Sequence, residues 1–417
     1  MSQELSKSRE LSKLLAPFFL LLFLLVSGLA MAKAKKLDDY HWTGVERVIA
    51  IGDLHGDYAQ YLNVMRSGGL LDKKGKWSGG KTHLVQTGDI TDRGADSRKI
   101  IDHLVKLAKQ AKKKGGYVHL LIGNHEAMNV TGDLRYVTRG EFSAFQSRNS
   151  QRYQDLQWQR QVDWMRVNVP TFGETDLDAY RKEWEQRVPL GWVEHRIAWS
   201  LDGEYGQWVK GNPVAIQIND SIFLHGGISA RYCKFSLESL TQQTIAAMQN
   251  YDPAITTIVD DPLGPIWYRG LATEDETDIY SQTLDNILNR YGAKRIVVGH
   301  TPTGGAVWPR FGQRVIVNDT GIAAYYGSHK GVLELTAAGA VAIYGDWRIP
   351  LPADNEGRED YLRAVIEADA NNGLLKNQLA RMLAPPAGDP GEPAVGEPAG
   401  QEGEETVLPV TTPGTCQ

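Results

Sequence analysis

The sequence predicts an α/β fold in which two mixed β-sheets pack together, helices cover their outer faces and a helical, Trp-rich insertion interrupts the chain. Short apolar runs alternate with amphipathic segments in the first part of the chain, and apolar runs dominate the second part. Alternating strands and helices produce parallel strand pairs with helical cover. With 417 residues, 42% of them hydrophobic, the chain is long enough to bury a large core.

The first part repeats a strand–turn–helix unit. We expect strands over residues 48–51, 84–87 and 117–122 and helices over residues 57–66 and 96–114, where apolar residues recur on one face. In open α/β sheets, ligands bind beside the carboxyl ends of the strands. The loops that follow these strands are therefore the expected place for a site.

The second part is richer in strands. Two runs flank Asn219-Asp220 and predict a hairpin. The expected strands cover residues 214–218, 221–224, 295–298, 315–317, 332–335 and 341–344, and a helix is expected near residues 277–291. We place one domain over residues 45–345, followed by a helical extension over residues 346–384.

Residues 130–210 differ from the rest of that domain. They are polar, charged and rich in Trp, and they contain no motif that indicates chemistry. Two interpretations remain open: a helical insertion whose Trp residues attach it to the body, or a cap that lines the substrate entrance.

The N-terminus has the layout of a secretory signal. Weakly basic residues precede an apolar run over residues 14–26, and the small-x-small triplet Ala30-Met31-Ala32 predicts cleavage after Ala32. Residues 1–32 are thus a predicted signal peptide, and the body is expected to be exported, in the periplasm. An uncleaved anchor in the inner membrane, with the body facing the periplasm, is the alternative, and the membrane is expected as a partner only through this segment.

The C-terminal residues 385–417 are rich in Pro, Gly and Glu, with six acidic residues and no Lys or Arg. They predict a disordered acidic tail, because such a segment buries too little apolar surface to offset its ordering entropy. The whole chain has a net charge of −5, and its middle is near neutral. The absence of a strong basic field argues against a general nucleic-acid binder.

The chain has two cysteines, Cys233 and Cys416. Exported proteins that depend on disulfides usually carry more of them. We therefore expect Cys233 to be a small buried hydrophobe rather than to form a disulfide with Cys416.

Five short motifs place metal-type ligands after an apolar run or a glycine. They are Gly52-Asp53-Leu54-His55-Gly56, Gly88-Asp89-Ile90-Thr91-Asp92-Arg93-Gly94, Gly123-Asn124-His125-Glu126, His225-Gly226-Gly227 and Gly299-His300-Thr301. Carboxylate, amide oxygen and imidazole together suit two divalent cations of intermediate hardness. Two such ions about 3.5–4 Å apart are the usual arrangement for displacement at phosphorus.

The residue types also indicate individual roles. In extended backbone Asp53 and His55 would point to the same side and reach one ion, and the two oxygens of Asp89 could bridge two ions. Arg93 can fork onto two phosphate oxygens. The remaining histidines have no such setting, and we interpret them as structural or solvent-facing: His41, His83, His103, His119, His195 and His329.

His125 follows Asn124 directly. In extended backbone it would point away from the ion that Asn124 binds and would be a proton donor rather than a ligand. Asp92 could accept a hydrogen bond from His125 and keep it cationic.

Taken together and in this order, the motifs resemble those of the calcineurin-like metallophosphoesterases. The Asp-Arg-Gly and Asn-His-Glu details are similar to the phosphoprotein phosphatase branch. Gly299-His300-Thr301-Pro302 and Pro265-Ile266-Trp267-Tyr268-Arg269-Gly270 resemble its bacterial-type, Shewanella-like members. The resemblance covers roughly residues 45–345, without the Trp-rich insertion.

The resemblance implies a role for each matching position. Asp53, His55 and Asp89 would hold the first metal, and Asp89, Asn124, His225 and His300 the second. A metal-bridging hydroxide would attack phosphorus without a covalent phosphoenzyme, and His125, partnered by Asp92, would protonate the leaving oxygen. Arg93 and Arg269 would bind the phosphoryl group, with Asn124 also beside the substrate.

We therefore expect a hydrolase of phosphomonoesters with two metal ions (Mn, Fe or Zn), acting on phosphotyrosine or phosphoserine/threonine in proteins. Small phosphoesters such as nucleotides or dinucleoside polyphosphates are the alternative substrates. A non-catalytic metal-binding protein of the same fold is a remote alternative, because every expected ligand and proton-transfer residue is present.

Overall fold

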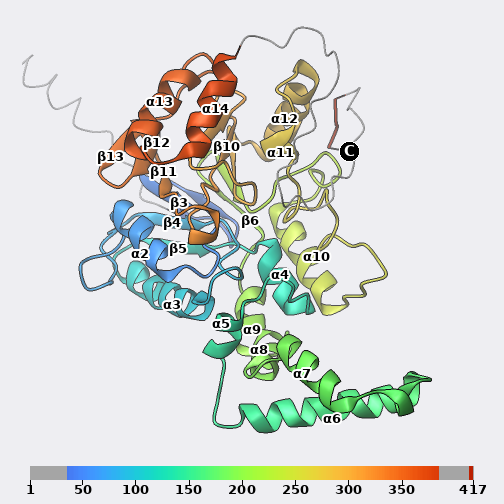
Figure 1. The fold of residues 1–417 in the computed structure, drawn as a ribbon. Helices are drawn as coiled ribbons and strands as arrows, with labels where there is room; N and C mark the ends of the chain where they lie inside the picture. Colours follow the sequence, from blue (N-terminus) through green and yellow to red (C-terminus); the bar gives the residue numbers. More distant parts are fainter. Residues whose placement is uncertain (1–34, 385–412, 417) are drawn as a thin grey trace, which may run out of the picture.

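The computed structural model describes residues 35–384 and 413–416 (Figure 1). The expected signal peptide and most of the expected acidic tail lie outside these residues. Within the described part of the chain, no helix combines the length and the apolar character that crossing a membrane requires.

The described chain forms two mixed sheets with helices around them. The strands are β1 (Lys35–Lys36), β2 (His41–Thr43), β3 (Arg47–Ile51), β4 (His83–Gln86), β5 (Tyr117–Leu120), β6 (Ala215–Ile218), β7 (Ser221–Leu224), β8 (Arg295–Val298), β9 (Trp308–Arg310), β10 (Val315–Val317), β11 (Gly331–Thr336), β12 (Gly339–Tyr344) and β13 (Trp347–Pro350). One sheet has the order β13-β12-β11-β3-β4-β5 and the other β1-β2-β6-β7-β8-β10-β9. The predicted fold class is confirmed.

The helices occupy the connections between strands and the C-terminal part. They are α2 (Tyr58–Ser67), α3 (Ser97–Lys113), α4 (Asn124–Thr131), α5 (Arg139–Ala144), α6 (Ser150–Asn168), α7 (Leu177–Arg187), α8 (Trp192–Trp199), α9 (Glu204–Lys210), α10 (Leu237–Gln249), α11 (Gly270–Thr273), α12 (Asp278–Tyr291), α13 (Arg358–Ala368) and α14 (Gly373–Leu383), with short 3-10 turns η1 (Phe172–Glu174) and η2 (Ala324–Tyr326). Hence every strand and helix expected from apolar periodicity is present, within a few residues of its expected bounds.

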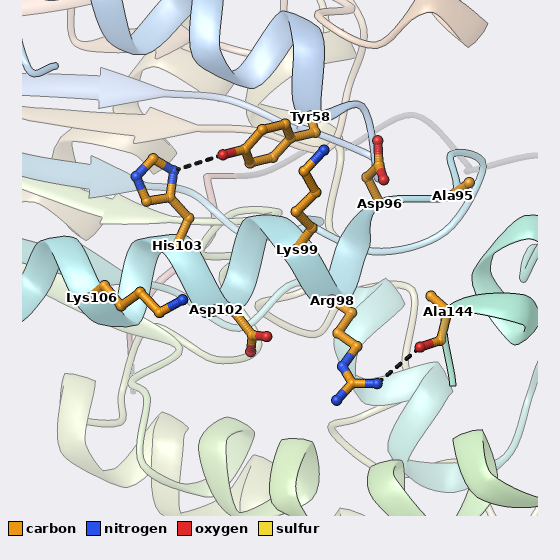
Figure 2. Close-up of a pocket in the computed structure, with 9 residues that line it drawn as sticks. All are labelled: Tyr58, Ala95, Asp96, Arg98, Lys99, Asp102, His103, Lys106 and Ala144. Atoms are coloured by element: carbon orange, nitrogen blue, oxygen red, sulfur yellow. Dashed lines mark hydrogen bonds between the residues drawn. The ribbon is translucent and has the colours of Figure 1, made fainter. Parts of the chain in front are cut away.

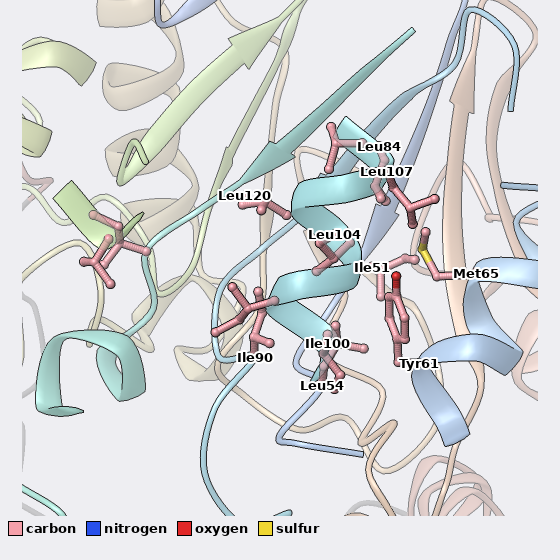
Figure 3. Close-up of a cluster of buried hydrophobic side chains, with 14 of the residues drawn as sticks. Ile51, Leu54, Tyr61, Met65, Leu84, Ile90, Ile100, Leu104, Leu107 and Leu120 are labelled. Atoms are coloured by element: carbon pink, nitrogen blue, oxygen red, sulfur yellow. The ribbon is translucent and has the colours of Figure 1, made fainter. Parts of the chain in front are cut away.

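The alternation of side chains along β3 divides the core. Val48 and Ala50 face the second sheet, whereas Ile49 and Ile51 pack under α2 and α3. Figure 3 shows Leu104 of α3 in the same hydrophobic cluster as Ile51. Because both faces of β3 are covered, its sequence is a continuous apolar run instead of an alternating one.

Two groups of parallel strands end at the same edge of the sandwich. β3, β4 and β5 are parallel neighbours, and so are β7, β8 and β10. The carboxyl ends of these strands carry the five metal-ligand motifs identified in the sequence. This edge is therefore where the fold positions a site.

Both sheets extend beyond the domain bounds expected from the sequence. β13 pairs antiparallel with β12, although we expected only helices after residue 345. At the other end of the chain, β2 pairs with β6 before residue 45. Edge strands this short carry too few residues for a periodic pattern, so the sequence did not reveal them.

The Trp-rich insertion is helical from α5 to α9. Trp199 and Trp184 are buried, but Trp164 is 57% exposed. Figure 1 shows α6 and α7 projecting away from the two sheets. Most of the insertion thus lies outside the site edge, and only its first loop, which carries Tyr136, reaches that edge.

The expectation that Cys233 is free was wrong. A disulfide joins Cys233 to Cys416, and the backbone N–H of Gly414 donates to Thr283 Oγ1 at 2.8 Å. Asn286 of α12 donates to the carbonyl of Gly414 at 2.9 Å. The prediction of a disordered tail is therefore wrong for residues 413–416, since a covalent bond and hydrogen bonds hold a segment that has little apolar surface of its own.

Candidate metal centre

The six expected metal ligands lie together just beyond the carboxyl ends of β3, β4, β5, β7 and β8. Each is no more than 5% exposed, and they come from both sheets: Asp53, His55, Asp89, Asn124, His225 and His300. The expected proton-transfer pair, Asp92 and His125, is buried beside them. The structure therefore brings together the residues that the motifs singled out.

The local backbone differs from the extended form that we expected. His55, Asp89, Asp92, Arg93 and His300 all have positive φ angles, between 42° and 71°. Non-glycine residues in this region are strained, and such residues cluster at functional sites. Asp53 and His55 therefore converge through a left-handed turn rather than through the alternation of a strand.

His125 also lies in a different setting from the expected one. Asn124 and His125 begin helix α4 instead of continuing an extended segment. The two side chains still leave the backbone in different directions, because consecutive helical residues are about 100° apart.

Each expected histidine ligand has one ring nitrogen paired with a backbone carbonyl. His55 Nδ1 donates to Thr91 O at 2.9 Å and His225 Nδ1 to Thr87 O at 2.9 Å. His300 Nε2 donates to the carbonyl oxygen of Trp267 at 3.0 Å. This arrangement sets the tautomer and leaves the other nitrogen of each ring as a lone-pair donor.

Those free nitrogens face further acceptors. His225 Nε2 lies 2.9 Å from Asn124 Oδ1, 3.1 Å from His300 Nδ1 and 3.2 Å from Asp89 Oδ2. Because the proton of His225 is on Nδ1, its Nε2 has only a lone pair. The short distances from Nε2 therefore join acceptor atoms that have no hydrogen to share. Such a cluster matches a cation, and Asp89, His225 and His300 satisfy the spacing of a metal-binding group.

A second group with metal-binding spacing contains His55, Asp89 and His125. His55 Nε2 lies 3.9 Å from Asp89 Oδ2 and 4.0 Å from Asp53 Oδ2. Asp89 therefore lies between the two groups, as expected for a bridging carboxylate. His125 Nε2 lies 3.8 Å from the same Asp89 oxygen.

The electrostatics of the site also fit cations. Burial, with the carboxylates of Asp319 and Asp89, raises the pKa of Asp53 well above its usual range. Burial lowers the pKa of His55 to about 3 and that of His300 well below its usual value. Buried carboxylates that repel one another beside neutral imidazoles are stabilised by bound cations.

Glycines bring the loops close enough for these contacts. A Cβ atom at Gly123 would lie 2.2 Å from Asp89 Oδ1, and one at Gly299 would lie 2.6 Å from Asp53 Oδ1. Any larger residue would therefore displace an expected ligand.

His125 is held in a hydrogen-bonded chain. Its Nδ1 lies 2.6 Å from Asp92 Oδ2, and Asn129 donates to Asp92 Oδ1 at 2.9 Å. Burial opposes the charged form, but the carboxylates of Asp89 and Asp92 outweigh it and raise the pKa of His125. A cation bound to Asp89 would weaken the attraction between Asp89 and His125 and leave that between Asp92 and His125.

The two arginines expected to bind phosphate lie at the rim of this centre. Arg93 is surrounded by the rings of Tyr136, Tyr325 and Tyr326. Arg269 donates from Nη1 to the carbonyl oxygen of His300 at 2.5 Å. Both guanidinium groups thus adjoin the metal centre.

Sequence reasoning missed two buried carboxylates of the site. Glu126 accepts the backbone N–H groups of Asp89, Ile90 and Gly123 at 2.8–2.9 Å and so ties two ligand loops together. Asp319 follows β10 and accepts from the Gly321 N–H at 3.0 Å. Asp319 had a detectable signal, since it follows an apolar strand and precedes a glycine as the other motifs do.

Two cavities lie near this edge. One of about 650 Å³ is lined by Met128, Trp267 and Arg269 and adjoins the metal centre. The other, of about 520 Å³, lies along α3, beside Tyr58 of α2 and Ala144 of α5, and contains none of the expected ligands. Figure 2 shows Lys99 against the ring of Tyr58 in this second cavity, where basic and acidic side chains alternate.

Comparison with known proteins places this geometry in a family. The sequence matches the calcineurin-like phosphoesterase family over residues 46–304, more than half of the chain. A Schizosaccharomyces pombe protein of uncharacterised function is 30% identical over 295 residues, covering 69% of this chain and 77% of the relative. Shewanella-like protein phosphatase 2 of Arabidopsis thaliana is 27% identical over 348 residues, covering 79% and 83%.

A solved structure shares the fold. The crystal structure of a cold-active protein-tyrosine phosphatase of a psychrophilic Shewanella species superimposes with a TM-score of 0.57 at 28% identity, covering 76% of this chain and 83% of that chain. The two metal-binding groups lie at the edge where the family motifs converge. The chain therefore belongs to the calcineurin-like phosphoesterase family and is a metal-dependent phosphatase.

Proposed function

We propose that this phosphatase removes phosphate from proteins, at phosphotyrosine or phosphoserine/threonine. The observation that carries the proposal is the convergence of buried acceptor atoms around Asp89 next to a hydrogen-bonded imidazole and two arginines. The names of its relatives support the protein substrate, since two of them are Shewanella-like protein phosphatases and a structural neighbour is a protein-tyrosine phosphatase.

The proposed ligand assignment follows the two clusters. Asp53, His55 and Asp89 would hold one ion, and Asp89, Asn124, His225 and His300 the other; carboxylate, amide and imidazole suit Mn, Fe or Zn. When bound, the ions would supply an activated water and neutralise the charge of the phosphate.

The protein's own side chains would perform the remaining steps. Arg93 and Arg269 would each bind phosphoryl oxygens and orient the ester, with Asn124 beside it. His125 would donate the proton on Nε2 to the leaving oxygen, while Asp92 holds Nδ1 and keeps the ring cationic. These roles require a protonated His125, and the contact with Asp92 favours that form.

Two measurements on the purified full-length chain test the proposal. Elemental analysis should find about two equivalents of Mn, Fe or Zn. Hydrolysis should then be compared on a panel of phosphopeptides and a panel of nucleotides and dinucleoside polyphosphates. A clear preference for the nucleotide panel would favour a small-phosphoester hydrolase, and bound metal without turnover of any ester would favour a non-catalytic protein.

We further propose that the protein is exported, with residues 1–32 as its signal. The Cys233–Cys416 disulfide supports this, because disulfides persist in oxidising compartments. Cell fractionation and the mass of the mature N-terminus test it. A mature chain that begins at Lys33 in the periplasmic fraction fits cleavage. An intact N-terminus in the membrane fraction fits an anchor, and a cytoplasmic reduced chain contradicts export.

A further inference from the structure

Three tyrosines enclose the guanidinium of Arg93. Its Cζ atom lies 4.5 Å from the ring centre of Tyr136, 4.8 Å from that of Tyr325 and 5.3 Å from that of Tyr326. Its buried Nε atom has no hydrogen-bond partner among the described residues. Cation–π attraction therefore holds the group in place and leaves N–H donors for an anion.

The same rings also contact the metal centre. The Tyr136 ring lies 5.0 Å from the ring of His125, and the Tyr326 ring lies 5.4 Å from that of His55. Tyr136 is further tied to the site because its carbonyl accepts the N–H of Arg93 at 3.0 Å. The tyrosines come from two segments that are distant in the sequence, the loop after α4 and the turn η2, and both segments contact Arg93.

The third ring extends this aromatic surface outward. Tyr325 packs edge-on against Tyr326, with ring centres 4.9 Å apart and planes at 77°, and its side chain is 64% exposed. An exposed aromatic ring that continues a partly buried pair beside a site offers surface to a ligand.

We propose that Tyr136, Tyr325 and Tyr326 form an aryl subsite that binds the aromatic ring of a substrate such as an aryl phosphate. This rests on the proposed function, since it assumes that Arg93 binds the phosphoryl group and His125 faces the leaving oxygen. A substrate placed in that way extends from His125 past the ring of Tyr136. A flat aryl group stacks on these rings, whereas an alkyl group forms fewer contacts.

The strength of aromatic pairing sets the expected effect. One pair of rings changes affinity by roughly 2–10-fold beyond the burial of area. The subsite should thus favour an aryl over an alkyl ligand of equal charge by about tenfold, because more than one ring contributes.

Two phosphonates that differ only in the ring provide the test. Phenylphosphonate and methylphosphonate should be titrated calorimetrically into the full-length, Mn-loaded protein. We expect phenylphosphonate to bind about tenfold more tightly, and Tyr325→Ala and Tyr136→Leu each to reduce that ratio by about threefold. Tyr325→Phe should retain the ratio because it keeps the ring, and Trp347→Ala, which removes a 48% exposed ring on β13, is the matched surface control.

Several results would overturn the subsite. They are equal affinity of the wild type for the two phosphonates, failure of both to bind, and variants that weaken both ligands equally. The last result would mean that the tyrosines only position Arg93.

Kinetics separate this failure from failure of the proposed function. Two peptides of identical sequence, one with phosphotyrosine and one with phosphoserine, should differ in kcat/KM, and Tyr325→Ala should reduce that difference. A chain that hydrolyses both peptides equally well in the wild type and the variant refutes only the subsite. A chain that hydrolyses no phosphoester refutes the phosphatase, and the ratio of phosphonate affinities still decides the subsite.

Discussion

Nδ1 of His125 lies 2.6 Å from Oδ2 of Asp92, and this short contact links the loop after β4 to the first turn of α4, which follows the neighbouring parallel strand β5. Asn129 occupies the other Asp92 oxygen and also donates to the His125 carbonyl at 2.9 Å. The imidazole is therefore fixed in direction, and its Nε2 faces the metal centre.

His125→Asn should lower kcat on an alkyl phosphate by roughly 10²–10⁴-fold, because a general acid contributes about that much. The fall in kcat should be smaller on an aryl phosphate, because its leaving group is a weaker base and needs less protonation. The variant should retain the wild-type metal content by elemental analysis. Loss of one metal equivalent would instead make His125 a ligand of the cluster that it forms with His55 and Asp89.

Asp89→Asn should lose both metal and turnover, since Asp89 belongs to both metal-binding groups. The amide oxygen is a weaker and uncharged ligand. Metal content and kcat should be measured before and after dialysis against a chelator, with Asp346→Asn, at an exposed position, as a surface control. Full metal occupancy in the variant would contradict the bridging assignment.

Cys416→Ser should reduce the free energy of unfolding by about 2–4 kcal/mol, because the disulfide closes a loop with a sequence separation of 183. Urea unfolding with and without reductant measures the effect. Reductant should destabilise the wild type and leave Cys416→Ser unchanged. If both proteins respond equally to reductant, the bond does not stabilise the fold.

His83→Phe should flatten the loss of stability at acid pH. Burial lowers the pKa of His83 from 6.5 to about 4 in the folded chain, and burial also lowers the pKa of its neighbour His119, whose Nε2 lies 3.0 Å from His83 Nδ1. The unfolded chain thus binds protons more readily than the folded chain. The contribution of neutral His83 to the free energy of unfolding is fully present above pH 6.5 and is lost as the pH falls towards 4.

The expected size of this effect is about 3 kcal/mol for His83 between these two pH values. Urea unfolding at several pH values should show a smaller slope in the variant than in the wild type. Parallel curves would show that His83 does not carry the pH dependence.

Local pattern was sufficient for the motifs and their common edge. The runs that end at Asp53, Asp89 and Asn124 are strands, and parallel strands in one sheet necessarily end at the same edge. The runs before His225 and His300 form the second sheet, and packing the two sheets together brings both sets of ends into one place. Apolar periodicity carries this information because it records which faces are buried.

The remaining features depend on contacts between distant parts of the chain. Three features have no signature in short windows of sequence: the left-handed backbone at His55 and Asp89, the bond from Cys233 to Cys416, and the packing of Tyr136 and Tyr325 on the same guanidinium. Each arises because packing elsewhere outweighs a local cost, in backbone strain or in chain entropy. Residue order was thus enough to recognise the ligands, whereas the orientation of each ligand and the surroundings of Arg93 follow from how the two sheets and their loops pack in three dimensions.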